Sequence, residues 1–120
     1  RRAEAASGAK IEILSGEMEA RLAAFGIIMG FKDPDGIAGD LGGGSLEVID
    51  IAGNVMRDAA TLPLGGLRLI DTTGNKLDAA LVAIDAAIAS LPWLAGGKGR
   101  PFYAVGGTWR ALAKLHMDLK

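Results

Sequence analysis

The sequence contains no cysteine, a single histidine and few aromatic residues. Without cysteine the chain can hold neither a disulfide framework nor a thiolate metal site, and it has no cysteine nucleophile. The one histidine, His116, forms no metal-site pattern, and we interpret it as structural or solvated. A formal net charge of −1 gives no electrostatic footprint for nucleic acid or a membrane surface. We therefore expect no nucleic-acid partner and no membrane partner.

Long apolar runs are also missing, so the sequence shows no signal-peptide core and no membrane span. The longest helical pattern, residues 77–91, carries Asp78 and Asp85. Half of the residues are nevertheless apolar, which is typical of a globular chain that can bury a core. We expect residues 1–120 to form a single cytoplasmic segment. Because the chain starts at Arg1 in the middle of a helical pattern, we also expect it to be part of a larger protein.

Strand and helix patterns alternate along the chain, which predicts an α/β fold with a mixed sheet. A short helix is expected over residues 2–7, with Gly8 as its stop. The strands are expected over residues 10–14, 37–41, 46–51, 55–62 and 101–105. The middle three would pair as antiparallel hairpins, and residues 63–66 would form a loop.

Three longer helices are expected, each with an apolar stripe at helical spacing. Ser15 would cap the first, which would reach about Met29, Asn75 would start the second, and residues 106–108 would open the last. The stripes expected to be buried are Met18, Leu22, Phe25 and Met29 in the first helix, Leu77, Leu81, Ile84, Ile88 and Leu91 in the second, and Trp109, Leu112, Leu115 and Leu119 in the third.

Three consecutive glycines and a serine separate two strand patterns in the stretch AGDLGGGSLEV, residues 38–48. Bare backbone amides can donate several hydrogen bonds to a phosphate, and glycine tolerates the positive φ that turns them into one concavity. Ser45 adds a hydroxyl donor. Asp40 would repel a phosphate unless a cation such as Mg²⁺ lies between them. The pattern predicts a phosphate–metal cradle, and a plain glycine-rich hairpin connection is the alternative.

A candidate water-orienting acid lies in the helix that follows Ser15. Glu17 has Arg21 four residues later, in the favourable orientation for an ion pair. Glu19 faces Ala23 at the same spacing and has no such partner, so it is the better candidate. Both acids also fit plain stabilisation of a helix N-terminus.

Four motifs together resemble the exopolyphosphatase/guanosine pentaphosphate phosphatase (Ppx/GppA) family. They are IEILSGEMEARL (11–22), GDLGGGSLE (39–47), LPLG (62–65) and VGGT (105–108), and they cover nearly the whole chain. The resemblance implies the actin-like, sugar-kinase-like ATPase fold, which is related to ribonuclease H. It also implies Mg²⁺-dependent removal of the terminal phosphate from inorganic polyphosphate or of the 5′ γ-phosphate from pppGpp, by a cytoplasmic protein that is a homodimer at full length.

Carried over by position, the resemblance implies that Glu19 orients the attacking water and that Asp40 helps bind metal and phosphate. Glu47 matches a further acid near the metal. The groups implied to bind phosphate are Gly42, Gly43, Gly44 and Ser45 in one loop and Gly106, Gly107 and Thr108 in another; the second resembles a loop near the adenosine in nucleotide-binding relatives.

The sequence departs from the family pattern in two ways. Met18 stands where the family commonly has the first of two adjacent glutamates, and an earlier phosphate loop of the type Asp-x-Gly-Ser is not found. That loop would lie before Arg1, so we expect this segment alone to bind phosphate poorly and to turn over slowly or not at all. Two other functions stay open: an ATP-dependent phosphotransferase or ATPase of the same superfamily, and a non-catalytic regulator that binds polyphosphate or (p)ppGpp.

Overall fold

The structure, a computed structural model, describes residues 2–119 and confirms the expected α/β fold with a mixed sheet. Four strands lie in the order β3-β2-β1-β4; β1, β2 and β3 pair antiparallel, and β4 pairs parallel to β1. The strands are β1 (Asp35–Leu41), β2 (Leu46–Ala52), β3 (Val55–Leu62) and β4 (Phe102–Val105). The helices are α1 (Arg2–Ser7), α2 (Gly16–Gly30), α3 (Gly66–Thr73), α4 (Leu77–Ala89), the 3₁₀ helix η1 (Pro92–Gly97) and α5 (Gly107–Asp118).

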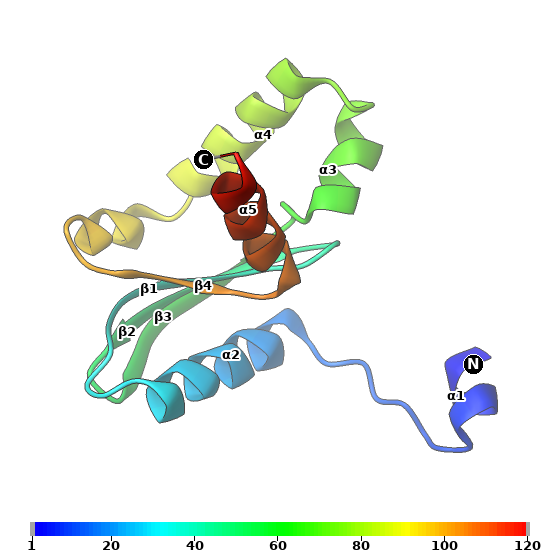
Figure 1. The fold of residues 1–120 in the computed structure, drawn as a ribbon, viewed down its shortest axis with the longest axis horizontal. Helices are drawn as coiled ribbons and strands as arrows, with labels where there is room; N and C mark the ends of the chain where they lie inside the picture. The colour runs from blue at the N-terminus through cyan, green and yellow to red at the C-terminus, as the bar shows by residue number, and fades with distance from the viewer. Residues whose placement is uncertain (1, 120) are drawn as a thin grey trace.

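Successive side chains of a strand point to opposite faces of the sheet, so apolar residues on both faces need a cover. Helices supply that cover on each side. Figure 1 shows α2 on one side of the sheet and α3, α4 and α5 on the other, with α1 lying apart. The core under α2 consists of Ala20, Ala24, Ile27, Ala38, Ile49 and Ile51. The opposite core consists of Ile37, Val48, Leu62 and Leu64, packed against residues of α3, α4 and η1.

Helix α2 begins as expected but buries a different face. The Ser15 hydroxyl accepts a hydrogen bond from the Met18 N–H at 3.3 Å, so the predicted cap is confirmed. The predicted buried stripe is wrong, since Met18, Leu22, Phe25 and Met29 are all exposed and Met29 is 88% exposed. The helix instead lays Ala20, Ala24 and Ile27 on the sheet. Small alanine side chains let the helix backbone approach the strands closely, and this close approach outweighs the larger apolar area of the other stripe.

Three further expectations about local structure are wrong. Residues 10–14 form no strand; no strand lies beside them among residues 2–119, and Ile13 is 92% exposed. A strand pattern without a neighbour leaves its backbone unpaired, so the segment stays extended in solvent. Helix α3 forms where only a loop and an unassigned segment were expected, and Gly74 ends it in the left-handed conformation with φ 60°. Helix α4 accordingly starts at Leu77 rather than at Asn75.

The stripes expected in the last two long helices are buried only in part. Ile84 and Leu91 pack against the second core, whereas Leu77, Leu81 and Ile88 are exposed. In α5, Trp109 is half-buried and its indole N–H donates to the Gly39 carbonyl at 2.9 Å. The other members of that stripe, Leu112, Leu115 and Leu119, are exposed.

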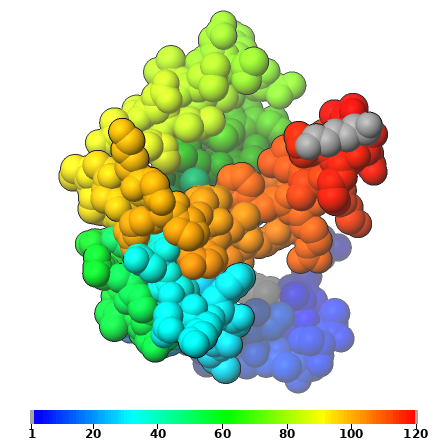
Figure 2. Space-filling model, turned by 60° about the vertical axis from the view of Figure 1, so that its left-hand side comes forward, coloured from blue at the N-terminus to red at the C-terminus, as the bar shows by residue number. Residues whose placement is uncertain are grey.

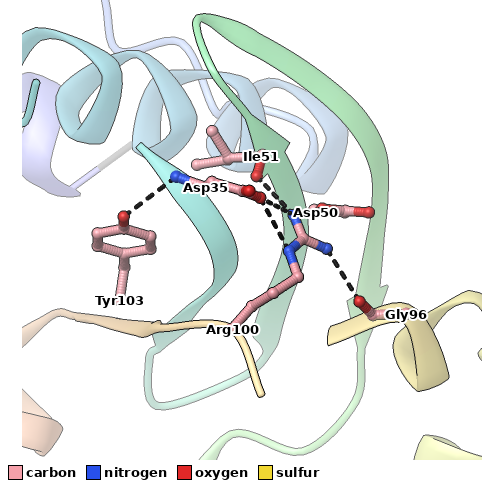
Figure 3. A network of polar contacts seen from close by, with 6 residues as sticks. All are labelled: Asp35, Asp50, Ile51, Gly96, Arg100 and Tyr103. Atoms are coloured by element: carbon pink, nitrogen blue, oxygen red, sulfur yellow. Dashed lines mark hydrogen bonds and ion pairs between the residues drawn. The ribbon is translucent and has the colours of Figure 1, made fainter. Parts of the chain in front are cut away.

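An arginine holds the strands together at the end of the sheet where β1 begins (Figure 3). The Arg100 guanidinium donates to one Asp50 carboxylate oxygen at 2.7 Å, to the Ile51 carbonyl at 2.8 Å and to Asp35 at 2.9 Å. These hydrogen bonds, above all that to the buried Asp50, raise the pKa of Arg100. The network links the start of β4 to β1 and β2, so it fixes the position of the edge strand.

Helix length and composition leave no membrane-spanning candidate in this part of the chain, since no helix within residues 2–119 is both long and apolar enough to cross a bilayer.

Candidate functional site

The glycine loop, Gly42–Ser45, joins β1 directly to β2. The two strands pair up to Leu41 and Leu46, so the loop is the whole connection between them. One pair further into the sheet, Asp40 lies directly opposite Glu47. Both carboxylates share the side of the sheet that α2 covers, because Ala38 and Ile49, two positions along each strand, belong to the core under α2. Opposite residues of this kind have Cβ atoms about 5 Å apart, so the hairpin sets two acids side by side.

The N-terminal turn of α2 packs closely against the sheet beside this acidic pair, because residue 16 is a glycine. Thr61 of β3 is the neighbour of Glu47 on the other side, and a Cβ placed on Gly16 would overlap the Thr61 side chain. The helix therefore starts in close contact with the sheet, beside the two acids. The result is a cleft of about 570 Å³, lined by Leu14, Glu19, Leu22, Ala23, Asp40, Gly42, Gly43, Gly44, Ser45 and Glu47.

Glu19 and Glu17 occupy different environments, as their spacing suggested. Arg21 Nε lies 3.9 Å from Glu17 Oε1, in an exposed ion pair. Glu19 lines the cleft, and within residues 2–119 its carboxylate forms no ion pair and no hydrogen bond. Its charge is therefore available to a bound molecule or water.

Glu47 is a buried acid without a full set of partners. The residue is 4% exposed, and its Oε1 atom has no hydrogen-bond partner. Burial raises the pKa of the Glu47 carboxyl, the Ser45 hydroxyl partly opposes this, and the charges of Glu19 and Asp40 raise it further. Buried polar atoms are normally satisfied, so an unpaired carboxyl oxygen facing two other acids calls for a cation or a proton.

The glycine loop presents backbone donors that the rest of the fold does not use. The Gly42 N–H donates to the Ser45 carbonyl at 3.0 Å. In the described part of the chain, the N–H groups of Gly43, Gly44 and Ser45 donate no hydrogen bond. The expectation that positive φ angles orient these amides is wrong, because none of the three glycines has one. A Cβ on Gly44 would meet nothing within 4 Å, so glycine here leaves room beside the backbone.

The second glycine motif lies beside the cleft and approaches one of its acids, Asp40, through Gly106. Gly106 precedes α5 with φ 103°, and a Cβ there would lie 2.8 Å from Asp40 Oδ1. Gly107 and Thr108, the first residues of α5, do not line the cleft. Gly106 instead lines a neighbouring groove of about 630 Å³ between α2 and α5, which shares Leu22 and Ala23 with the cleft. In Figure 2 the orange segment that carries β4 crosses the face between the yellow η1 region and the cyan end of α2.

The donor set of the cleft fits a divalent cation of the magnesium type. No group of three or more His, Asp or Glu side chains between residues 2 and 119 is arranged to hold a metal ion alone. Mg²⁺, however, is usually held by one or two carboxylates together with substrate phosphates and waters. Asp40 and the unsatisfied Glu47 oxygen provide such a pair.

Sequence reasoning missed the other wall of the cleft. Leu14 and Leu22 line it, although Leu14 was assigned to a strand and Leu22 to a buried stripe. The spacing of Ala23 from Glu19 was the available signal, because residues four apart share one helix face. The LPLG motif had no role assigned, yet its Gly65 is in contact with the glycine loop.

A family model and solved structures both relate the chain to one family. A family model described as the Ppx/GppA phosphatase family matches residues 1–88. The Aquifex aeolicus PPX-GPPA enzyme is 25% identical with a TM-score of 0.64, and the alignment covers 98% of this chain and 40% of that one. An exopolyphosphatase-like protein is 22% identical with a TM-score of 0.68, covering 98% and 42%. None of the curated proteins matches the chain. The chain thus spans about 40% of the length of these solved relatives.

Proposed function

The chain belongs to the Ppx/GppA phosphatase family, with its actin-like ATPase fold, and we propose that the full-length protein hydrolyses terminal phosphoanhydride bonds. The proposed substrates are inorganic polyphosphate and pppGpp, which both end in a phosphoryl group joined through a phosphoanhydride. One observation carries the proposal: Glu19, the Asp40–Glu47 pair and the unused amides of the glycine loop line a single cleft.

The glycine loop would bind the terminal phosphoryl group. Its free N–H groups are fixed donors, and such donors stabilise negative charge on phosphoryl oxygens without reorganising during the reaction. Ser45 adds a hydroxyl. Asp40 and Glu47 would hold Mg²⁺, which when bound neutralises charge on the phosphates. The apolar side chains of Leu14 and Leu22 on the opposite wall limit the water that reaches the bound group.

Glu19 would orient the attacking water. Its carboxylate accepts a hydrogen bond from the water, whose oxygen then attacks the terminal phosphorus. The bond between that phosphorus and the bridging oxygen breaks, and the bridging oxygen keeps the electron pair. Orthophosphate leaves together with a chain shortened by one phosphate, and the proton lost by the water passes through Glu19 to solvent. Such a positioned acid typically contributes about 10²–10⁴-fold to the rate.

The unpaired state of Glu19 favours catalysis over the regulator, because a non-catalytic regulator has no need of a free carboxylate beside the phosphate loop. A phosphotransferase would use the same carboxylate to accept the proton of its acceptor hydroxyl, so the acceptor of the phosphoryl group distinguishes it from a hydrolase. The regulator would still bind polyphosphate or pppGpp, but it would release no phosphate.

The test is phosphate release from polyphosphate and from pppGpp by the full-length protein with Mg²⁺. We expect Glu19→Gln to lower kcat at least 100-fold, within the range for loss of a positioned acid. Asp40→Asn should shift the Mg²⁺ dependence to higher concentrations. Glu17→Gln is the matched control, because Glu17 pairs with Arg21 on the exposed side of the same turn. Wild-type turnover in Glu19→Gln would contradict its role, and binding without release by the wild-type protein would indicate a regulator.

A further inference from the structure

Gly65 lies against the backbone of the glycine loop and is not among the residues that line the cleft. It is buried and immediately precedes α3. A Cβ placed on it would run into the backbone of both Gly43 and Gly44. These are backbone atoms, which cannot move aside as the end of a flexible side chain can. Only glycine at position 65 lets the loop take its present position.

The first turn of α3 also holds the loop through hydrogen bonds. The Leu67 N–H donates to the Gly43 carbonyl at 2.9 Å, and the Arg68 N–H donates to the same oxygen at 3.2 Å. Amides at a helix N-terminus have no partner within the helix and carry the positive end of its dipole. In α3 these donors satisfy a loop carbonyl, so they fix the direction in which that carbonyl points.

The direction of one carbonyl determines the direction of the next amide. The Gly43 C=O and the Gly44 N–H belong to one planar peptide unit, in which the two groups point in opposite directions. Because the carbonyl points at α3, the Gly44 N–H points away from it. The cleft lined by Glu19, Asp40 and Glu47 contains no α3 residue, whereas a recess on the other side of the loop is lined by Leu67 and Arg68. The Gly44 N–H is therefore turned away from α3, and Gly44 itself lines the cleft, to which α3 contributes no residue.

We propose that Gly65 and the first turn of α3 clamp the glycine loop so that the Gly44 N–H is presented to the terminal phosphoryl group. In this proposal, which rests on the proposed function, Gly65 is a positioning residue that acts through the 43–44 peptide without touching the substrate. The clamp gives the LPLG motif, in which Gly65 is the last residue, a role in phosphate binding.

The first test compares two adjacent glycines in the full-length protein. Gly65→Ala introduces the backbone clash, whereas a Cβ on Gly66 meets nothing within 4 Å, so Gly66→Ala is the matched control. We expect Gly65→Ala to raise KM for tripolyphosphate and the inhibition constant of inorganic phosphate by about tenfold, as for loss of one hydrogen bond to a charged group. Partial loss of folded enzyme would lower the apparent kcat and leave KM and the inhibition constant unchanged.

The second test removes a donor instead of adding bulk. Leu67→Pro deletes the N–H that bonds the Gly43 carbonyl, at a first-turn position where proline is tolerated. Leu67→Ala removes the same side chain and keeps the N–H. The proline variant should raise both constants and the alanine variant should not, and circular dichroism checks that each variant is folded. If Gly65→Ala does not fold, the comparison of Leu67→Pro with Leu67→Ala alone decides whether the clamp acts on phosphate binding.

The outcomes separate the clamp from the function on which it rests. If the wild-type protein releases no phosphate, the proposed function fails. If it releases phosphate and the constants of folded Gly65→Ala or Leu67→Pro equal those of their controls, the clamp is wrong and the function stands.

Discussion

The buried acid Glu47 is expected to make the protein less stable than it could be, and Glu47→Gln tests this. The substitution keeps the shape of the side chain and removes its charge. In the native fold Glu47 is 4% exposed, and its Oε1 atom has no hydrogen-bond partner. Leaving a buried polar group unsatisfied costs about 1–3 kcal/mol, and more when the group is charged; the uncharged amide of glutamine removes the part that is due to the charge. We therefore expect Glu47→Gln to raise the free energy of unfolding at pH 8, without Mg²⁺, by about 1–2 kcal/mol.

The effect should depend on pH with a defined sign. Burial raises the pKa of Glu47 above its ordinary value of 4.5, so folding penalises the charged form. Below pH 4.5 the group is protonated in both the folded and unfolded states, and wild type and variant should be equally stable. The penalty appears as the pH rises through the raised pKa. The gain from Glu47→Gln should therefore be near zero at pH 4 and largest at pH 8.

Urea denaturation of the full-length protein at the two pH values measures the difference. Glu12→Gln, in an exposed segment, changes the net charge equally and should alter stability little at either pH. Mg²⁺ should stabilise wild type at pH 8 more than Glu47→Gln, because a ligand that binds only the folded state adds its binding free energy to stability. A variant less stable than wild type at pH 8, or a gain equal at both pH values, would refute the interpretation of Glu47 as an unsatisfied acid.

Three further variants probe the walls of the cleft and the sheet. Gly44→Ala should change stability by less than about 0.5 kcal/mol, since its Cβ meets nothing within 4 Å, yet raise KM for tripolyphosphate; an unchanged KM would place the phosphate elsewhere. Gly106→Ala places a side chain at φ 103° and against Asp40, so it should cost about 1 kcal/mol or more of stability in thermal melts and weaken activation in Mg²⁺ titrations. Gly107→Ala, the control, should change neither quantity. Arg100→Met should lower Tm by leaving Asp50 buried without its cation, and adding Asp50→Asn should restore most of the loss; an additive effect in the double variant would contradict the pairing.

The sheet could be predicted from the sequence because its signals are local. The hairpins of β1, β2 and β3 follow from short apolar runs separated by glycine-containing turns, among them the turn at Gly53, which has φ 61°. Once the hairpin over residues 37–51 is accepted, the pairing of Asp40 with Glu47 follows from its register. The position of these two acids can therefore be predicted without knowing the rest of the fold.

The packing of α2 could not be predicted in this way. The helix carries two apolar stripes at helical spacing, and the pattern alone favours the larger side chains of Leu22 and Phe25. The choice of Ala20 and Ala24 depends on how closely the helix approaches the sheet, which Gly16 sets through its contact with Thr61. Tertiary contact therefore decides which face is buried and, with it, that Glu19 and Leu22 line the cleft.

The contact between α3 and the glycine loop could likewise not be predicted from local sequence patterns. Gly65 and Gly66 were interpreted as loop residues, since paired glycines usually mark a turn. In the structure Gly65 precedes a helix whose first amides satisfy Gly43. Glycine is required there because of Gly43 and Gly44, more than twenty positions earlier in the chain. A local sequence pattern contains no information on such a distant contact.

The most direct measurement of the central claim is the fate of oxygen in water enriched with ¹⁸O. If Glu19 orients water for attack on a phosphoryl group bound by the glycine loop, each phosphate released from polyphosphate or pppGpp will contain one oxygen atom from the labelled water. Glu19→Gln will then lose the labelled product, and Glu17→Gln will keep it. Unlabelled phosphate passed to another acceptor, or equal labelled release by Glu19→Gln and wild type, would contradict the account.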